Sequence, residues 1–355
     1  MKASFLVATI AAPMLAMALT WSYPTSVAAK DKFGPWGPPV NLGPIVNSTS
    51  HDERPAISRD DLSLYFDSNR PGGFGGNDIW VSHRASVDDP WEPPQNLGPI
   101  VNSAGKQFSQ FSPNLSPNGH WLFFGSDRPG GCGKLDIWAS HRKDRDDDFA
   151  WEPPVNLGCV TNGSVNTSAD DDFPNLFVDN EEDVTLLYFA SNRSYGGYHI
   201  YQSKMNEDGT FGPAVLVPNI NCFEQTCTRD SRSTIRRDGL EFIFGSWQRP
   251  WLDKPKGFGK QDLWVATRKD TEDPWSMPVN LGSVINTMDN EGGPALSRDG
   301  TTLYFHSDRP GGIGLLDLYC TTRTKLREDE GDDEVAADHS SRTVLITRVR
   351  DRCAP

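Results

Sequence analysis

One motif repeats along this chain, and the repeat constrains the fold more than any other feature. Three copies are close to one another: RPAISRDDLSLYFDSNRPGGFGGNDIWVSHR at 54–84, SPNLSPNGHWLFFGSDRPGGCGKLDIWASHR at 112–142 and GPALSRDGTTLYFHSDRPGGIGLLDLYCTTR at 293–323. Two weaker copies, at 173–203 and 232–268, lie between them. Five copies spaced about 60 residues apart indicate a repeat architecture in which each copy forms one structural unit.

Each copy contains three predicted strands. In the first copy one strand ends at Ile57, a second covers 64–68 and a third covers 79–83, with turn residues between them. A fourth strand follows the first four copies, at 91–102, 151–162, 211–221 and 275–286. The equivalent strand is missing after the fifth copy and stands at 36–47 instead. We therefore predict an all-β, five-bladed β-propeller whose last blade is closed by the N-terminal strand.

The composition agrees with an all-β chain and argues against one class of partner. The sequence contains 32 Gly, 27 Pro and 11 Trp, residues that disfavour helices or favour strands. Its 48 acidic residues exceed its 34 Lys and Arg, and the formal net charge is -14. Such a surface repels phosphate backbones, so we expect no nucleic-acid partner.

The N-terminal residues read as an export signal. Lys2 precedes an apolar run over 5–19, and the small residues at 27–29 match a signal-peptidase site. The run is short for a bilayer and is interrupted by Pro13, so we predict no membrane span in the mature chain. The expected domains are a signal peptide at 1–29, a propeller at 30–323, and an acidic linker with a short tail strand at 324–355. We expect a secreted or periplasmic monomer.

Export also suggests how the six cysteines are used. An even number of cysteines in an oxidising compartment favours disulfide bonds over free thiols. Cys222 and Cys227 bracket one short loop, and Cys353 lies in a tail that needs an anchor. We predict the pairs 222–227, 132–159 and 320–353.

The repeats resemble the TolB-type, WD-like β-propeller family over residues 36–323. The resemblance rests on a Pro-x-Ile-Ser-x-Asp-Gly pattern followed by Leu-Tyr-Phe-x-Ser-Asp-Arg-Pro-Gly-Gly and Asp-Ile-Trp. It implies a propeller fold and a place in the cell envelope, where such repeats also occur beside peptidoglycan-binding domains. It says little about activity, because propellers support binding, scaffolding and hydrolysis alike.

Residues that recur in every copy are best interpreted as structural. One arginine per copy is expected to fasten a loop to the acid that follows it: the arginines are Arg70, Arg128, Arg193, Arg249 and Arg309, and the acids are Asp78, Asp136, Asp262 and Asp317. A second level, at the start of each inner strand, is nearly a ring of carboxylates: Asp52, Gln110, Asp171, Asp230 and Glu291. The residue after each of these is, in chain order, Glu53, Phe111, Asp172, Ser231 and Gly292.

Three interpretations of the carboxylate ring remain open. Each acid can cap its own loop by accepting backbone hydrogen bonds. The ring can instead hold a hard cation such as calcium, with no other cofactor expected. The third interpretation is acid-base chemistry on a sugar, with two carboxyl groups facing each other across the channel mouth.

Asymmetric residues on the same face point to a ligand. Aromatic and charged side chains that the other copies lack gather in copies three and four: Tyr195, Tyr198, His199, Arg229, Arg232, Trp247, Gln248 and Trp251. Such a mixture suits a saccharide, a peptide or a small polar ligand. His306, where other copies carry Asp67 or a small residue, is interpreted as scaffold.

Two functional hypotheses follow. The motifs of serine hydrolases, kinases, dehydrogenases and zinc proteases are missing from the sequence. The leading hypothesis is therefore a non-catalytic propeller that binds a glycan, a peptide or a cell-envelope protein. The alternative is an enzyme acting on a saccharide or small polar molecule, with Asp52, Asp171, Asp230 or Glu291 as acid or base.

Overall fold

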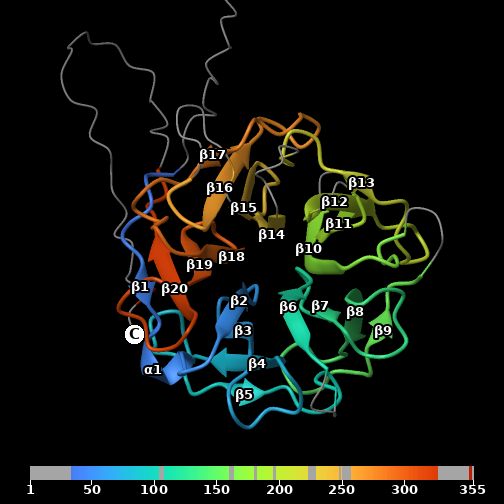
Figure 1. Cartoon of the computed structure of the whole chain (residues 1–355), viewed down its shortest axis with the longest axis horizontal. Coiled ribbons are helices and arrows are strands. Elements are labelled where there is room, and N and C mark those ends of the chain that lie inside the picture. The colour runs from blue at the N-terminus through green and yellow to red at the C-terminus, as the bar shows by residue number, and fades with distance from the viewer. Residues whose placement is uncertain are drawn as a thin grey trace, which may run out of the picture.

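The computed structural model describes residues 33–103, 108–159, 164–179, 182–194, 197–222, 229–247, 249, 257–326 and 352–353. Within these residues, twenty strands form five four-stranded antiparallel sheets. The helix α1 (Gly43–Val46) is a single turn. The sheets stand around a common centre like the blades of a propeller (Figure 1). The predicted all-β, five-bladed fold is confirmed.

Each blade runs outward from an inner strand, and we name the blades A to E in chain order. Blade A contains β2 (Asp52–Ile57), β3 (Ser63–Ser68), β4 (Asp78–His83) and β5 (Gln95–Asn96). Blade B contains β6 (Gln110–Leu115), β7 (Trp121–Ser126), β8 (Asp136–His141) and β9 (Val155–Asn156). Blade C contains β10 (Asp171–Asp179), β11 (Val184–Ser191), β12 (His199–Lys204) and β13 (Val215–Leu216). Blade D contains β14 (Arg229–Ile235), β15 (Glu241–Trp247), β16 (Gln261–Thr267) and β17 (Val279–Asn280).

Blade E is built from both ends of the described chain. It contains β18 (Glu291–Leu296), β19 (Thr302–Ser307), β20 (Asp317–Thr322) and, as its outer strand, β1 (Val40–Asn41). Val40 pairs with Cys320, and the Leu42 amide donates to the Leu318 carbonyl at 3.0 Å. In Figure 1 the blue β1 lies beside the red β20. The predicted closure by the N-terminal strand is confirmed.

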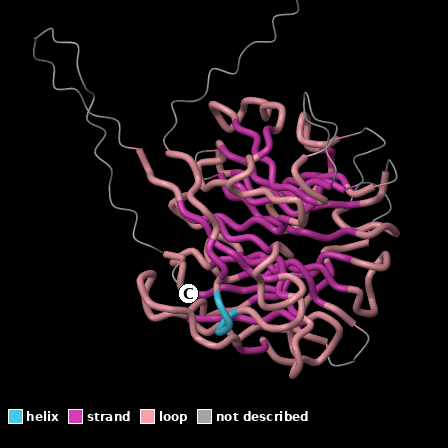
Figure 2. Tube along the Cα trace, turned by 60° about the vertical axis from the view of Figure 1, so that its left-hand side comes forward, coloured by secondary structure: helices cyan, strands magenta, loops and turns pink. Residues whose placement is uncertain are grey.

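The hydrophobic core lies between neighbouring blades. Five clusters of buried side chains each join two adjacent blades, so every blade packs on both of its faces. Strands form the body of the described molecule in the turned view of Figure 2, and Figure 1 shows α1 at its edge, near β20. We call the end where β2, β6, β10, β14 and β18 begin the upper face, and the end where they finish the lower face.

Two predicted disulfides are present. Cys132 pairs with Cys159, and Cys320 pairs with Cys353, which ties the tail to blade E. Cys222 is disulfide-bonded, but residue 227 lies outside the described residues, as do the signal peptide at 1–29 and the tail strand at 343–348. No helix in the described part of the chain is long and apolar enough to cross a bilayer.

Candidate functional site

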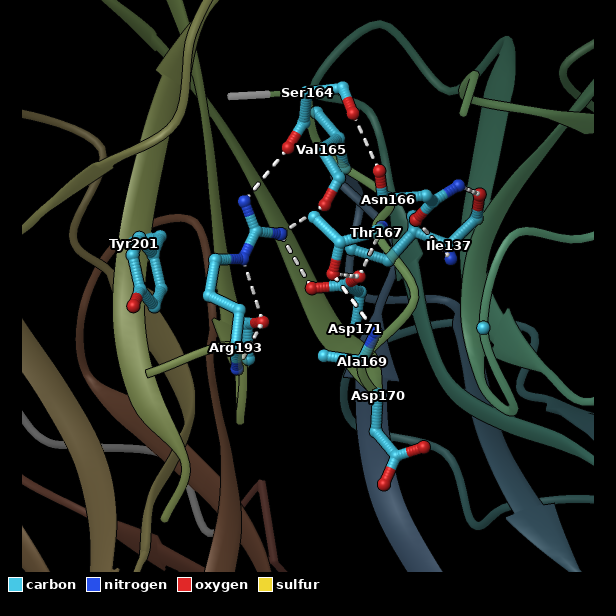
Figure 3. Close-up of polar contacts among 12 residues, drawn as sticks. Ile137, Ser164, Val165, Asn166, Thr167, Ala169, Asp170, Asp171, Arg193 and Tyr201 are labelled. Atoms are coloured by element: carbon cyan, nitrogen blue, oxygen red, sulfur yellow. Dashed lines mark hydrogen bonds and ion pairs between the residues drawn. The ribbon is translucent and has the colours of Figure 1, made fainter. Parts of the chain in front are cut away.

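The predicted carboxylate ring forms the fastenings of the upper loops. In blade C, Asp171 accepts hydrogen bonds from the Thr167 amide at 2.6 Å and from the Thr167 hydroxyl at 2.9 Å (Figure 3). Its other oxygen pairs with Arg193, which also donates to the Val165 carbonyl. The guanidinium lies 4.9 Å from the centre of the Tyr201 ring. Asp171 thus holds the loop that precedes its own strand.

The same fastening recurs in three other blades. Asp52 accepts from the Ser48 amide and pairs with Arg70, Asp230 accepts from the Cys222 amide and pairs with Arg249, and Glu291 accepts from the Thr287 amide and pairs with Arg309. These hydrogen bonds are those that the loop-cap interpretation expects. The recurring arginines are clamps, but the partners predicted for them were wrong. Asp78 and its equivalents instead accept amide hydrogens from the glycine-rich loops.

Blade B lacks this ion pair, and that difference yields a prediction. Gln110 replaces the acid, and burial without a carboxylate partner lowers the pKa of Arg128 to about 10. The Gln110 side-chain oxygen has no hydrogen-bond partner among the described residues. In Gln110→Glu, the new carboxylate can accept from Ser103 and pair with Arg128, as Glu291 does in blade E. We expect this variant to be stabilised by about 1.5 kcal/mol, measured by urea unfolding. Gln110→Met is the control and should show no gain.

The inner strands contain a β-bulge just below the ring. The strand pairing shifts between Glu53 and Ala56, and equivalent shifts occur in the other four blades. At the bulge, Arg54, Ser112 and Phe173 adopt positive φ angles of 51°, 55° and 60°. Bulges turn neighbouring side chains in a new direction. Here the residues after the ring are brought together at the upper end of the central channel.

A charged cluster lies between the upper ends of the inner strands. Arg54 pairs with Asp67 at 2.7 Å and with Glu53 at 3.0 Å. Asp67 also accepts hydrogen bonds from the Ser112 amide at 3.0 Å and the Asn77 side chain at 3.1 Å. Asp67 is fully buried, whereas Glu53 retains 12% of its side-chain exposure. Asp67 therefore orients Arg54. Glu53, whose other oxygen lies 3.4 Å from His51 Nδ1, keeps the greater exposure of the two carboxylates.

Asp172 is the third carboxyl group of the cluster. It comes from blade C, is 3% exposed, and accepts a long hydrogen bond of 3.4 Å from the Ser112 hydroxyl. Its Oδ1 atom has no hydrogen-bond partner among the described residues. The carboxyl lies against Gly125 of blade B, where any added Cβ atom would overlap it. This close approach explains why blade B carries glycine at that position.

The environment moves the pKa values of Asp172 and Glu53 in opposite directions. Burial raises the pKa of Asp172, although Arg54 opposes the shift. Burial would also raise the pKa of Glu53, but the combined charges around it, above all Arg54, lower it below 4.5. Burial raises the pKa of Asp67 to about 6. One cluster thus offers an ionised carboxylate and a carboxyl group that holds its proton to higher pH.

Aromatic rings surround the cationic side chains. Arg54 lies 5.4 Å from the Phe111 ring and 5.7 Å from the Phe173 ring. Arg229 lies 5.1 Å from Phe173 and 4.8 Å from Tyr198, and its Nε atom has no hydrogen-bond partner among the described residues. Phe111, Tyr198 and Arg229 are partly exposed. They offer apolar faces and free donor capacity at the channel mouth.

The other predicted ligand-binding residues do not form a continuous surface with this cluster. Arg232 is buried and donates to the carbonyls of Arg54, Pro55 and Pro113, so it fastens the inner strands. His199 is buried 4.0 Å from Asp230 of the adjacent clamp. Trp247 ends β15, opposite Arg229. Residues 195, 248 and 251 lie outside the described residues, and the ligand-binding role of the whole set stays a prediction.

Two further predictions concern histidine and metal. Burial lowers the pKa of His306 to about 4, and its Nδ1 atom accepts a hydrogen bond from the Arg54 amide at 3.2 Å, which is a scaffold contact. Among the described residues, no group of three or more His, Cys, Asp and Glu side chains is arranged to hold a metal ion. The calcium alternative therefore stays a prediction.

The residues of this cluster are not those of the predicted carboxylate ring: Glu53 and Asp172 each follow a ring residue by one position. Glu53 and Asp172 stood in the level after the ring, and Asp67 stood at the position of His306. The sequence could have indicated Glu53 and Asp172, because acids stand at their position in only two of the five copies. The ring position is acidic in four of five and is therefore more typical of a structural role. Arg54 had no signal, because its direction depends on the bulge.

Comparisons with known proteins support the fold. No protein-family model matches the sequence, and no curated protein matches it. The catalytic domain of a GH62 α-L-arabinofuranosidase from Coprinopsis cinerea matches with a TM-score of 0.53 and 12% identity, over 82% of this chain and 98% of that chain. An exo-1,5-α-L-arabinanase from a bovine ruminal metagenomic library matches with a TM-score of 0.53 and 16% identity, over 83% and 100%. An α-L-arabinofuranosidase from Lactobacillus brevis matches with a TM-score of 0.53 and 12% identity, over 81% and 94%.

These matches place the chain in a class of fold, the five-bladed propeller that glycoside hydrolases also use. The TolB-type resemblance predicted a propeller correctly, but the matched structures are glycoside hydrolases rather than TolB-type proteins. The leading functional hypothesis, a propeller that only binds, was wrong as first choice. The solved structures that match this fold are glycoside hydrolases, the class of enzyme that the alternative hypothesis named.

Proposed function

We propose that this chain is an exported glycoside hydrolase-like enzyme that acts at the upper end of its central channel. One observation carries the proposal: Glu53 and Asp172 belong to one cluster, and their pKa values are moved in opposite directions. Most glycoside hydrolases use two carboxyl groups, one that keeps its proton and one that is ionised. The glycoside hydrolase folds that match the chain support the same class of reaction.

The two carboxyl groups take different roles. Asp172 is the proton donor to the leaving oxygen, because its buried carboxyl keeps a proton. Its Oδ1 lies against Gly125, so the carboxyl must rotate toward the sugar before it can donate that proton. Glu53 is the ionised partner that activates water or attacks the sugar, since its side chain is the more exposed. Asp67 is a positioning residue that holds Arg54 beside both.

The surrounding residues suit a saccharide ligand. The partly exposed rings of Phe111 and Tyr198 can stack on the C–H faces of a sugar, and the Arg229 guanidinium can donate to its hydroxyl groups. One matched structure, a GH62 hydrolase, is a complex with xylotriose. The disulfides at 132–159 and 320–353 fit an oxidising compartment and support a secreted or periplasmic enzyme.

The test is hydrolysis of a defined substrate panel by the purified mature chain: 4-nitrophenyl α-L-arabinofuranoside, linear arabinan, arabinoxylan and xyloglucan. Where wild type hydrolyses a member, we expect Glu53→Gln and Asp172→Asn each to lower kcat by about 10²- to 10⁴-fold. Glu207→Gln and Asp146→Asn, which change exposed acids elsewhere, should retain full rate. Thermal melting of all four variants shows whether each is folded.

The pH profile gives a second readout. Activity should rise as Glu53 ionises below pH 4.5 and fall at higher pH as Asp172 loses its proton. The activity that remains in Glu53→Gln should no longer rise with pH in the acidic range. The proposal fails if the panel is hydrolysed at wild-type rate by both folded variants, or if no member is hydrolysed.

A further inference from the structure

A cavity of about 520 Å³ opens at the lower face, at the opposite end of the inner strands from Glu53. Its floor is formed by one aliphatic residue at the same position of each inner strand: Ile57, Leu115, Leu176, Ile235 and Leu296. All five are partly exposed rather than buried. The volume lies within the range of about 300 to 1,000 Å³ that is usual for small-molecule sites.

One side of this cavity is cationic. The turns after β14, β18 and β2 place Arg237, Arg298 and Arg59 on its wall, and these turns belong to three consecutive blades. All three arginines are exposed, and none forms an ion pair with a described carboxylate. Loss of hydration and the charges of Arg237 and Arg59 lower the pKa of Arg298, while the charge of Asp61 opposes the shift.

The acids on the same turns are engaged mainly by groups other than these arginines, except that Asp61, which pairs with Arg352 at 3.5 Å, also acts on Arg298 through its charge. Asp60 accepts from the Ser58 hydroxyl, Asp238 pairs with Arg236, and Asp299 pairs with Arg352. Each of these aspartates is therefore engaged by its own turn or by the tail. No described carboxylate lines this cavity, although Asp61, Asp238 and Asp299 line the adjoining cavity together with the same three arginines. The aspartates stabilise the turns, whereas the side chains of the three arginines form no described hydrogen bond within these turns.

The opposite side of the cavity is apolar. Blades B and C contribute Trp121, which is 38% exposed, together with Phe177 and Met205. An aromatic ring and a methionine on one wall, facing guanidinium groups on the other, form a polarised site. A neutral sugar would leave the arginines without a partner, and a small inorganic anion would leave the apolar wall uncovered.

We propose that the lower cavity binds an organic anion with an apolar body. The anionic group lies on the side of Arg59, Arg237 and Arg298, and the apolar body lies against Trp121 and the aliphatic floor. The site is separate from the upper cluster, so it stands or falls independently of the proposed hydrolase activity.

The test uses two dyes of nearly equal shape. 8-Anilinonaphthalene-1-sulfonate carries an anionic group, and N-phenyl-1-naphthylamine is the same framework without it. We expect saturable 1:1 binding of the sulfonate dye to the folded mature chain, followed by its fluorescence. In the triple variant Arg59→Gln, Arg237→Gln, Arg298→Gln, its Kd should rise at least about tenfold, whereas binding of the neutral dye should change less than about twofold. Trp121→Ala should weaken binding of both dyes.

Three comparisons complete the test. The control variant Lys143→Gln, Arg145→Gln, Lys269→Gln removes three exposed charges elsewhere and should leave both affinities unchanged. Raising the salt concentration should weaken the sulfonate dye more than the neutral dye. The titrations are repeated with a variant in which the seven acids between 328 and 338 are changed to amides. If this acidic stretch competes with the dye for the arginines, the variant should bind the sulfonate dye more tightly.

Two results would overturn the proposal. The first is equal affinity of wild type and the Arg59, Arg237, Arg298 variant for the sulfonate dye, with or without the acidic stretch. The second is an equal loss of affinity in the control variant, which would show a general effect of net charge. The proposal is likewise overturned if the sulfonate dye binds neither the wild type nor the variant whose acids at 328–338 are changed to amides.

Discussion

Deletion of residues 33–47 from the mature chain should abolish stable folding. The deletion removes β1 and α1, and with them the outer strand of blade E. Leu42 and Val46 are 2% and 0% exposed and belong to the cluster between blades E and A. Trp36 packs on Arg323 at 4.2 Å. The strand β20 would then present an open edge.

The expected loss is large because several terms act together. Each buried aliphatic side chain that is removed costs roughly 1.5 to 3 kcal/mol, and an unpaired strand edge also promotes aggregation. Val40 and Ile45 are 36% and 53% exposed, so Leu42, Val46 and Trp36 account for most of the loss. The sum approaches the whole stability of an ordinary domain.

Truncation after Arg323 is the matched comparison. It removes the disulfide between Cys320 and Cys353 and the buried Cys353 side chain, at a cost of about 2 to 5 kcal/mol. Both truncations are expressed, and their solubility and thermal melting are compared with those of the mature chain. We expect the tail truncation to fold with a lower Tm. If the N-terminal deletion melts like the mature chain, closure by β1 is not what holds the ring.

The second large effect is expected at Asp148, which joins blades A and B. Its carboxylate accepts hydrogen bonds from the Ser63 hydroxyl and from His83 Nε2, each at 2.7 Å, and from Tyr65. It also pairs with Arg142, which is only 3% exposed. Asp148→Asn leaves this arginine without its charge partner. Because breaking a buried pair on one side costs about 3 to 5 kcal/mol, urea unfolding should show a loss of that size.

The effect should depend on pH in a defined direction. Burial alone would raise the pKa of Asp148, but hydrogen bonds from His83, Tyr65 and Arg142 lower it well below 3.8. Its contribution is therefore present above pH 3.8 and is lost as the pH falls. The hydrogen bond to Asp148 raises the pKa of His83, so that contribution is complete below pH 6.5 and is lost as the pH rises through the raised value.

Stability curves of wild type and Asp148→Asn should thus differ most between pH 3.8 and 6.5. Asp146→Asn changes an exposed acid two residues away and is the control, with no expected loss of stability. A difference between wild type and Asp148→Asn that is constant from pH 3 to pH 9 would contradict the assigned network.

The repeat alone determined the architecture of this protein. Five copies, each with turn residues at equivalent positions, required five similar blades, and the displaced strand at 36–47 required closure by the N-terminus. Two of the three disulfides predicted from the cysteine spacing are also present. These features were predictable because they depend on strand order and local turn chemistry, which the sequence pattern contains directly.

Only the tertiary structure decided which residues meet in the channel. The ring acids fasten the loops that precede them, and the bulge that follows brings Glu53, Asp172 and Arg54 together. The arginines of the lower cavity, and Asp148 between blades A and B, likewise acquire meaning from neighbours distant in sequence. A strand pattern has a period of two and shows which residues share a face, but a bulge breaks that period through a backbone conformation that residue types such as Arg54 do not signal.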